Sequence, residues 1–121
     1  MFAAKGIDPN QTDGESSMHD ATAAGRGYAC AGGVADAIEQ CIHEYYPDVD
    51  VKIEPADGLA ECKKMLMLAK AGKKNGCLIE GMACPGGCVA GAGTNIPIPQ
   101  AVKEVTSFKN AAEEKLPSKE D

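Results

Sequence analysis

Residues 49–80 read VDVKIEPADGLAECKKMLMLAKAGKKNGCLIE. Apolar and charged residues alternate from 49 to 54, which is typical of a half-buried strand. After an Asp-Gly turn, apolar residues recur at helical spacing over 59–71, and Gly72 suits the carboxyl cap of that helix. A short apolar run at 77–80 predicts another strand. The helix would face the core with Leu59, Cys62, Leu66 and Ala69.

The flanking segments continue this alternation. The small, apolar residues at 25–31 are compatible with a buried strand, and 34–46 has the apolar period of a helix ended by Pro47. Pro99 suits the first turn of a last helix, whose apolar face falls between 101 and 112. The order predicts an α/β fold with a small, mainly parallel sheet of about three to four strands and three flanking helices. Because a sheet this small exposes an edge or a face, we expect it to pack on something else.

The chain has 121 residues, which is enough for one domain. We expect a flexible polar lead-in at 1–20, because this segment has turn signals and no apolar period. The α/β domain would cover 21–112. A charged tail follows at 113–121, and Pro117 within it predicts that the tail frays.

Composition excludes several classes of partner. The formal net charge of −6 argues against nucleic-acid binding, because an acidic surface repels phosphate. No apolar run approaches the ~20 residues of a membrane span, and the amino terminus has no apolar stretch of signal-peptide length, so we expect a cytoplasmic protein. In a reducing cytosol, the six cysteines indicate metal ligation or burial rather than disulfides. Cys41 and Cys62, on apolar helix faces, are interpreted as packing residues.

The candidate site is the segment EGMACPGGCVAGAG at 80–93. Cys84 and Cys88 are separated by Pro-Gly-Gly, which lets the chain fold tightly and aim both sulfurs at one point. Backbone N–H groups of this turn, at Gly86 and Gly87, are able to point at sulfide or at an anionic ligand. Thiolate is the ligand of iron–sulfur clusters, so this loop is a candidate cofactor site.

Spacing alone leaves other interpretations open. Zinc sites and redox pairs use similar spacing, and Cys30 and Cys77 are candidates for further ligands. Glu80 beside the loop either serves protons or sits at a strand end, and we favour the second role. His43 lies on the outward side of a helix, and His19 falls in the lead-in, so neither indicates a catalytic arrangement.

A longer stretch of sequence around the two cysteines is a more specific signal than their spacing alone. The loop resembles the last of three signature motifs of iron-only (FeFe) hydrogenase large subunits, through MACPGGC at 82–88 followed by GAG at 91–93. The segment GRGYACAGGV at 25–34 resembles a small-residue segment of that family that ends in Gly-Gly-Val before a helix. The segment at 57–64 resembles the family helix before the last motif. Residues 20–112 therefore resemble the carboxyl-terminal half of the catalytic domain, one lobe of a larger two-lobed hydrogenase fold.

The resemblance implies a cofactor and a reaction. In this family four cysteines hold the H-cluster, a 4Fe–4S cubane joined through one cysteine sulfur to a two-iron unit with CO, cyanide and a bridging dithiolate. By motif position, Cys84 resembles a cubane ligand and Cys88 the bridging cysteine, and Met82 resembles the side chain that lines the two-iron pocket. Gly86 and Gly87 lie in the same cofactor-binding loop. The implied reaction is reversible proton reduction to dihydrogen, with electrons from ferredoxin or a similar carrier.

Two of the family's motifs, a Thr-Ser-Cys-Cys-Pro-like string and a Met-Pro-Cys-x-x-Lys-like string, are absent from the chain. These motifs carry the other cluster cysteines, so the resemblance implies a partner, namely the missing amino-terminal half of the catalytic domain. We therefore expect the isolated chain to be inactive. The pair Cys30-Ala31 stands where the family often has Ala-Thr before Gly-Gly, and Cys30 has no family role. The alternatives are a stand-alone iron–sulfur or zinc-binding module and a metal-free interaction domain.

Overall fold

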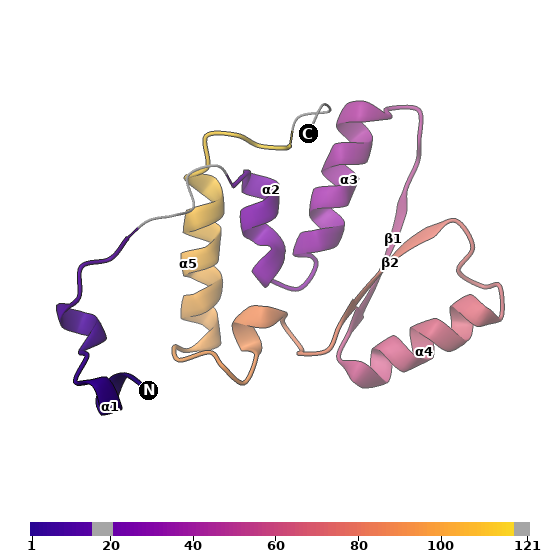
Figure 1. Ribbon diagram of the computed structural model, residues 1–121. Coiled ribbons are helices and arrows are strands. Elements are labelled where there is room, and N and C mark those ends of the chain that lie inside the picture. Colours follow the sequence, from indigo (N-terminus) through magenta and orange to yellow (C-terminus); the bar gives the residue numbers. More distant parts are fainter. Residues whose placement is uncertain (16–20, 118–121) are drawn as a thin grey trace.

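The computed structural model describes residues 1–15 and 21–117. The parts of the predicted lead-in and tail at 16–20 and 118–121 lie outside the described residues, as does His19. The described helices and strands are α1 (Phe2–Lys5), α2 (Ala23–Arg26), α3 (Gly33–Tyr45), β1 (Lys52–Asp57), α4 (Leu59–Lys70), β2 (Cys77–Met82) and α5 (Ile98–Asn110) (Figure 1). Short 3₁₀ turns lie at Pro9–Gln11, Gly27–Ala29 and Cys88–Ala90.

The two strands form a parallel ladder, with Lys52 opposite Cys77 and Asp57 opposite Met82. They lie between α3 and α4, and α2 packs against both α3 and α5 (Figure 1). The predicted α/β class with parallel strands is confirmed. Within the described residues the sheet has two strands, fewer than expected, and β1 begins at Lys52 instead of at 49.

The predicted strand at 25–31 is wrong, because this segment continues α2 into a 3₁₀ turn. Thr22 precedes α2 in an extended conformation, and its Oγ1 accepts the Gly25 N–H at 3.2 Å. Such a side-chain cap satisfies a backbone donor that an isolated helix end would leave unpaired. Small residues at 25–31 fit a buried helix as well as a buried strand, so composition did not distinguish the two.

The predicted charged tail is held in place as far as Pro117. Backbone N–H groups of Ala23 and Ala24 donate to the carbonyl oxygens of Glu114 at 2.8 Å and Lys115 at 3.0 Å. The Tyr45 hydroxyl donates to the carbonyl oxygen of Pro117. This part of the tail therefore lies against α2 and α3, and it supplies acceptors to the otherwise unpaired donors at the start of α2.

Small side chains make up most of the core. Among the described residues, the buried apolar side chains other than Val89 are alanines, namely Ala23, Ala24, Ala35, Ala37, Ala56, Ala101 and Ala112. Each alanine removes little apolar area from water, so hydrophobic burial contributes modestly per residue. Polar contacts between the helices and strands therefore contribute more to fixing how these elements are arranged.

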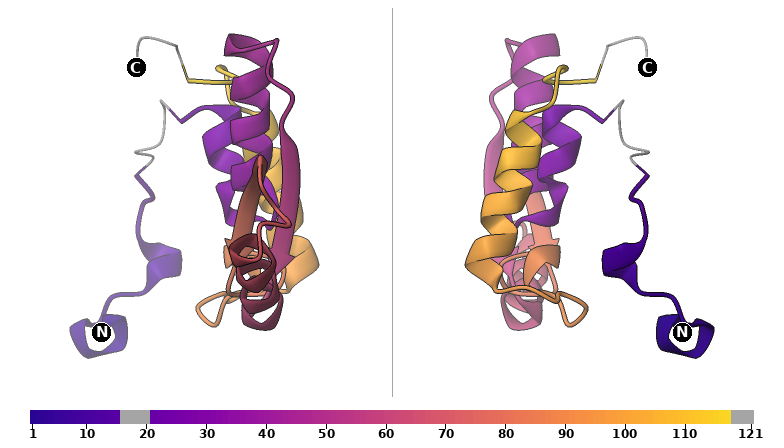
Figure 2. Two further views of the ribbon diagram at one scale, coloured as in Figure 1. Left: turned by 90° about the vertical axis from the view of Figure 1, so that its right-hand side faces the viewer. Right: turned by 90° about the vertical axis from the view of Figure 1, so that its left-hand side faces the viewer.

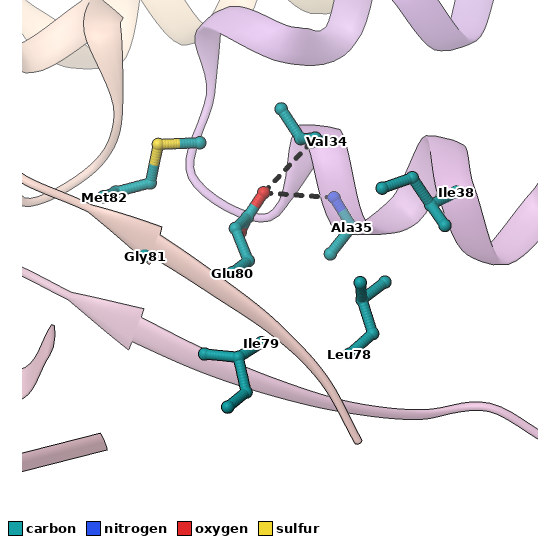
Figure 3. A pocket seen from close by; sticks show the side chains of 8 residues that line it. All are labelled: Val34, Ala35, Ile38, Leu78, Ile79, Glu80, Gly81 and Met82. Carbon is teal, nitrogen blue, oxygen red and sulfur yellow. Dashed lines mark hydrogen bonds between the residues drawn. The ribbon is translucent and has the colours of Figure 1, made fainter. Parts of the chain in front are cut away.

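Glu80 makes the most extensive of these contacts. It is a charged residue of β2 that is only 9% exposed. Its Oε2 accepts the Gly32 N–H at 2.7 Å, and its Oε1 accepts the N–H groups of Val34 and Ala35, both at 3.1 Å (Figure 3). Because α3 begins after Gly32 without a side-chain cap of its own, the carboxylate satisfies its unpaired donors and complements the positive end of its dipole.

Helix α4 presents a narrower apolar face to the sheet than its sequence predicts. Leu59 and Leu66, two of the expected core positions, are 72% and 66% exposed. Cys62, Met65 and Ala69 are half-buried instead, and they follow one another at helical spacing. A sheet of two strands covers only a narrow stripe of a helix, which leaves the outer leucines in water.

Helix α5 is fastened to α2 and α3 by charged groups. The Arg26 guanidinium lies 4.2 Å from the centre of the Phe108 ring, and its Nη1 donates to the Phe108 carbonyl oxygen at 3.1 Å. Lys109 Nζ lies 2.8 Å from Asp36 Oδ2. The hydrogen bond from Lys109 lowers the pKa of the Asp36 carboxyl below its ordinary value of 3.8.

Residues 1–15 are exposed throughout and stand apart from the other described helices and strands (Figure 2). Within 1–15 and 21–117, no helix has the combination of length and apolar composition that crossing a membrane requires.

Glu80→Gln is expected to reduce the free energy of unfolding by about 1–3 kcal/mol, because the charge-assisted bonds to the start of α3 are weakened or left unmade. Urea denaturation followed by circular dichroism measures this effect. The matched control is Glu104→Gln, at an exposed position of α5, which should change stability by less than about 0.5 kcal/mol. Equal effects of the two substitutions would contradict the role assigned to Glu80.

The Asp36–Lys109 pair predicts a pH-dependent term in stability. Since the folded pKa of Asp36 is lowered, the pair stabilises the fold above pH 3.8 and loses its effect as the pH falls through the folded value. Asp36→Asn should therefore cost up to about 1 kcal/mol near pH 7 for this partly exposed pair, and close to nothing once the pH is below the lowered, folded pKa of Asp36. Urea titrations at both pH values, with Asp50→Asn as the control, test this. A cost that is independent of pH would refute it.

Candidate metal centre

The loop between the two candidate cysteines is a tight turn. The Gly87 N–H donates to the Cys84 carbonyl oxygen at 2.9 Å, which closes a four-residue turn with Pro85 and Gly86 at its centre. Gly86 has φ +94°, and Pro followed by a glycine with positive φ is the arrangement of a type II turn. A 3₁₀ turn starts at Cys88 directly after it. The predicted tight fold of the Pro-Gly-Gly segment is confirmed.

Two neighbouring segments fasten this turn. Both carboxylate oxygens of Asp57, at the end of β1, accept the Gly86 N–H at 3.1 Å. The Gly86 carbonyl oxygen in turn accepts the Ala31 N–H at 3.0 Å. The turn is therefore tied to the carboxyl end of the sheet on one side and to the start of α3 on the other.

Gly87 allows the closest of these approaches. A Cβ at this position would lie 2.5 Å from the Ala31 nitrogen, 2.7 Å from the Cys30 carbonyl carbon and 2.8 Å from the Ala29 carbonyl oxygen. These distances are far below van der Waals contact, and all three atoms belong to the backbone. Gly87 also has φ +90°, which L-residues with side chains rarely adopt. The loop backbone at Gly87 therefore packs directly against the backbone of residues 29–31, with no space for a side chain.

The N–H groups of Gly86 and Gly87 are engaged within the protein, by Asp57 and by Cys84. The sequence suggested that these N–H groups donate to a bound cofactor, but in the structure neither of them is free to do so. What these two glycines contribute in the structure is the shape of the turn that carries the thiols.

The Cys84 and Cys88 thiols are both exposed. The Cys84 Sγ also lies 3.8 Å from the position that a Cβ on Gly91 would occupy, so the end of the loop turns back toward this thiol. Two accessible sulfurs on one fixed turn are suited to bind a thiophilic metal. Within 1–15 and 21–117, however, no three His, Cys, Asp or Glu side chains gather to hold a metal ion, so the two cysteines do not belong to a closed site among these residues.

The other cysteines do not complete the site. Cys77 begins β2, and a strand of this length places it about 16 Å from Met82 at the other end. The backbone of Cys30 touches Gly87, but Cys30 is half-buried and belongs to no three-ligand group among the described residues. Cys62 packs as predicted, with its Sγ 3.4 Å from the Ala56 carbonyl oxygen.

A hollow of about 300 Å³ lies beside the loop, at the carboxyl ends of both strands. Met82 lines it, as do Asp57, Gly32 and Glu80. Ligands of parallel α/β sheets bind in such crevices beyond the carboxyl ends of the strands. Met82 therefore lines a part of the sheet where ligands of this fold class bind, while the Glu80 oxygens there are held by α3.

Sequence reasoning missed the structural roles of Asp57 and Glu80. A signal was present for Glu80, because a helix that starts at Gly33 without Ser, Thr, Asp or Asn before it needs an acceptor from elsewhere. For Asp57 the only signal was its place in an Asp-Gly turn, which does not reveal a partner at Gly86.

The sequence matches a known protein family. A family model described as "Iron only hydrogenase large subunit, C-terminal domain" matches residues 1–92. The matched segment includes both strands, the turn with Cys84 and Cys88, and the hollow beside it. No curated protein matches the sequence.

Gly87→Ala is expected to lower the free energy of unfolding by at least about 2 kcal/mol, since the added Cβ meets backbone atoms and the φ angle is unfavourable. Thermal or urea denaturation measures the loss. Gly93→Ala is the matched control, because a Cβ there meets nothing within 4 Å. If the two variants were equally stable, the contact at residues 29–31 would not restrain the loop.

Proposed function

This chain belongs to the family formed by the carboxyl-terminal domain of iron-only hydrogenases, and we propose that it supplies two thiolate ligands to the H-cluster of such an enzyme. The assembled enzyme would reduce protons to dihydrogen reversibly, with electrons from ferredoxin or a similar carrier. The observation that supports this most directly is the pair of exposed thiols on the fixed turn at 84–88.

The residues of the turn fit part of the cluster's ligand set. Cys84 would bind the cubane and Cys88 would provide the sulfur shared with the two-iron unit. When bound, the cluster supplies electron storage and the site of hydrogen chemistry. The chain's own contribution is to hold both sulfurs outward on one rigid turn, which limits the conformational entropy lost when they bind.

Met82 would form part of the wall around the two-iron unit, because its side chain lines the hollow at the strand ends. Gly86 and Gly87 would shape the binding loop, since any larger residue at 87 would collide with the backbone. The Asp57 carboxylate would position the turn through the Gly86 N–H. These residues orient the ligands and exclude water from one side of the site.

Two thiolates leave the cluster incomplete, because the family's site needs four. The remaining ligands would come from the amino-terminal part of the hydrogenase catalytic domain. We expect the chain alone neither to hold a stable 4Fe–4S cluster nor to evolve dihydrogen.

Co-expression with the amino-terminal half of an iron-only hydrogenase catalytic domain and the maturation proteins tests this proposal. The co-purified complex should contain iron and sulfide and should evolve dihydrogen with reduced carrier. Cys84→Ser and Cys88→Ser should each reduce the activity by at least about 100-fold, because each removes a ligand. Cys77→Ser, at the far end of β2, is the matched control and should leave iron content and activity unchanged.

Two other outcomes would replace the proposal. Anaerobic reconstitution of the isolated chain with iron and sulfide that gives a stable cluster, lost in Cys84→Ser, would indicate a stand-alone iron–sulfur module; a stoichiometric zinc ion would indicate a zinc module. A folded chain that gains no metal in any pairing would indicate an interaction domain.

A further inference from the structure

The Asp57 carboxylate lies against the middle of the cysteine turn at 84–88. Both of its oxygens accept the Gly86 N–H at 3.1 Å. Gly86 is two residues from Cys84 and two from Cys88. Since consecutive Cα atoms are about 3.8 Å apart, the Asp57 carboxylate lies on the order of 10 Å from the Cα atoms of both cysteines. A unit charge is therefore close to any group that the two thiols bind.

No positive side chain neutralises this carboxylate in the part of the chain that the structure describes. The ion pairs there join lysines to other acidic residues, namely Asp36, Glu54 and Glu61. Within the same part of the chain, the hydrogen bonds of Asp57 engage one neutral backbone N–H, that of Gly86. A neutral donor satisfies the carboxylate oxygens but leaves the net charge in place.

Glu80 is the other carboxylate of the hollow at the strand ends, and its surroundings differ. It is buried, and three N–H groups at the start of α3 donate to its oxygens (Figure 3). The positive end of the helix dipole compensates its charge as well. Asp57 has no such surroundings, so it is the carboxylate whose negative charge acts on the hollow.

The contact between Asp57 and Gly86 affects a bound cluster in two ways. The reduction potential of an iron–sulfur cluster depends on the net charge near it and on the N–H groups that donate to its sulfurs. A fixed negative charge opposes the addition of an electron, and at about 10 Å with an effective dielectric constant of about 20 it changes that equilibrium by about tenfold. The contact also directs the Gly86 N–H to Asp57, so this donor is not available to a sulfur. Both effects lower the reduction potential.

We propose that the negative charge of Asp57 lowers the reduction potential of the iron–sulfur cluster bound through Cys84 and Cys88. This inference rests on the proposed function. It gives Asp57 an electrostatic role in addition to positioning the turn through the Gly86 N–H. Electrons held at a lower potential reduce protons more readily, so the charge favours the evolution of dihydrogen over its oxidation.

Two substitutions separate the charge of Asp57 from its hydrogen bonds. Asp57→Asn keeps an oxygen that accepts the Gly86 N–H and removes the charge, whereas Asp57→Ala removes both. Amide hydrogen exchange of the full isolated chain, measured by nuclear magnetic resonance, compares the two variants. The Gly86 amide should exchange at the wild-type rate in Asp57→Asn and at least about tenfold faster in Asp57→Ala. Circular dichroism of each variant establishes that it is folded.

The reduction potential is measured in the complex with the amino-terminal half of an iron-only hydrogenase catalytic domain, by redox titration followed by electron paramagnetic resonance. Asp57→Asn should raise the ratio of reduced to oxidised cluster about tenfold at a given potential, which is a shift of about 59 mV for one electron. Asp57→Ala should shift the potential in the same direction. Asp50→Asn, which removes an exposed charge before the opposite end of β1, is the matched control and should leave the potential unchanged.

A purely structural role of Asp57 predicts that only Asp57→Ala changes the potential. An unchanged potential in Asp57→Asn would therefore overturn the inference, and so would loss of iron or of Gly86 protection in that variant, because the charge would then serve the fold. The proposed function is measured separately, by the dependence of iron content on Cys84 and Cys88. Iron that depends on both thiols, with equal potentials in wild type and Asp57→Asn, overturns only the inference on charge. Iron that does not depend on them overturns the proposed function.

Discussion

The carboxylate of Glu80 binds the amino terminus of α3 across 46 residues of sequence, and the arrangement of the sheet and the helices depends on this contact. The buried side chains are mostly alanines, which pack in more than one way with similar energy. Three backbone N–H groups aimed at one carboxylate allow a single arrangement. The contact sets the distance between β2 and α3, and with it the position of Ala31, whose N–H binds the cysteine turn.

From this anchor the candidate site is built by backbone contacts. Asp57 and Ala31 hold Gly86 from opposite sides, and Gly87 lies against residues 29–31 with no room for a side chain. The thiols of Cys84 and Cys88 do not need to pack inward to be positioned, and both remain exposed. Rigidity of the turn and accessibility of the sulfurs are thus achieved together, a combination that a ligand-binding loop requires.

The strand–helix–strand unit was predictable from sequence because apolar residues recur at every second position over 49–54 and at helical spacing over 59–71. Glycine also marks the end of α4. The conformation of 25–31 was not, since its small residues suit either a helix or a strand and the Thr22 cap decides between them. The exposure of Leu59 and Leu66 also could not be foreseen, because it depends on how many strands lie beneath α4. For the site, the sequence indicates the turn and its two sulfurs, and the partners at Asp57 and Ala31 depend on tertiary packing.

The family model matches the chain as far as residue 92, yet contacts within the domain extend beyond that residue. Carbonyl groups of Glu114 and Lys115 accept the first donors of α2, and Phe108 stacks beneath Arg26. Cutting the chain after residue 92 would leave the Ala23 and Ala24 donors without their acceptors and would remove the Phe108 ring and carbonyl oxygen from the Arg26 guanidinium. It would also remove α5, which packs against α2. The contacts that hold α2 and α3 in place therefore continue past the matched segment, into α5 and the residues that follow it.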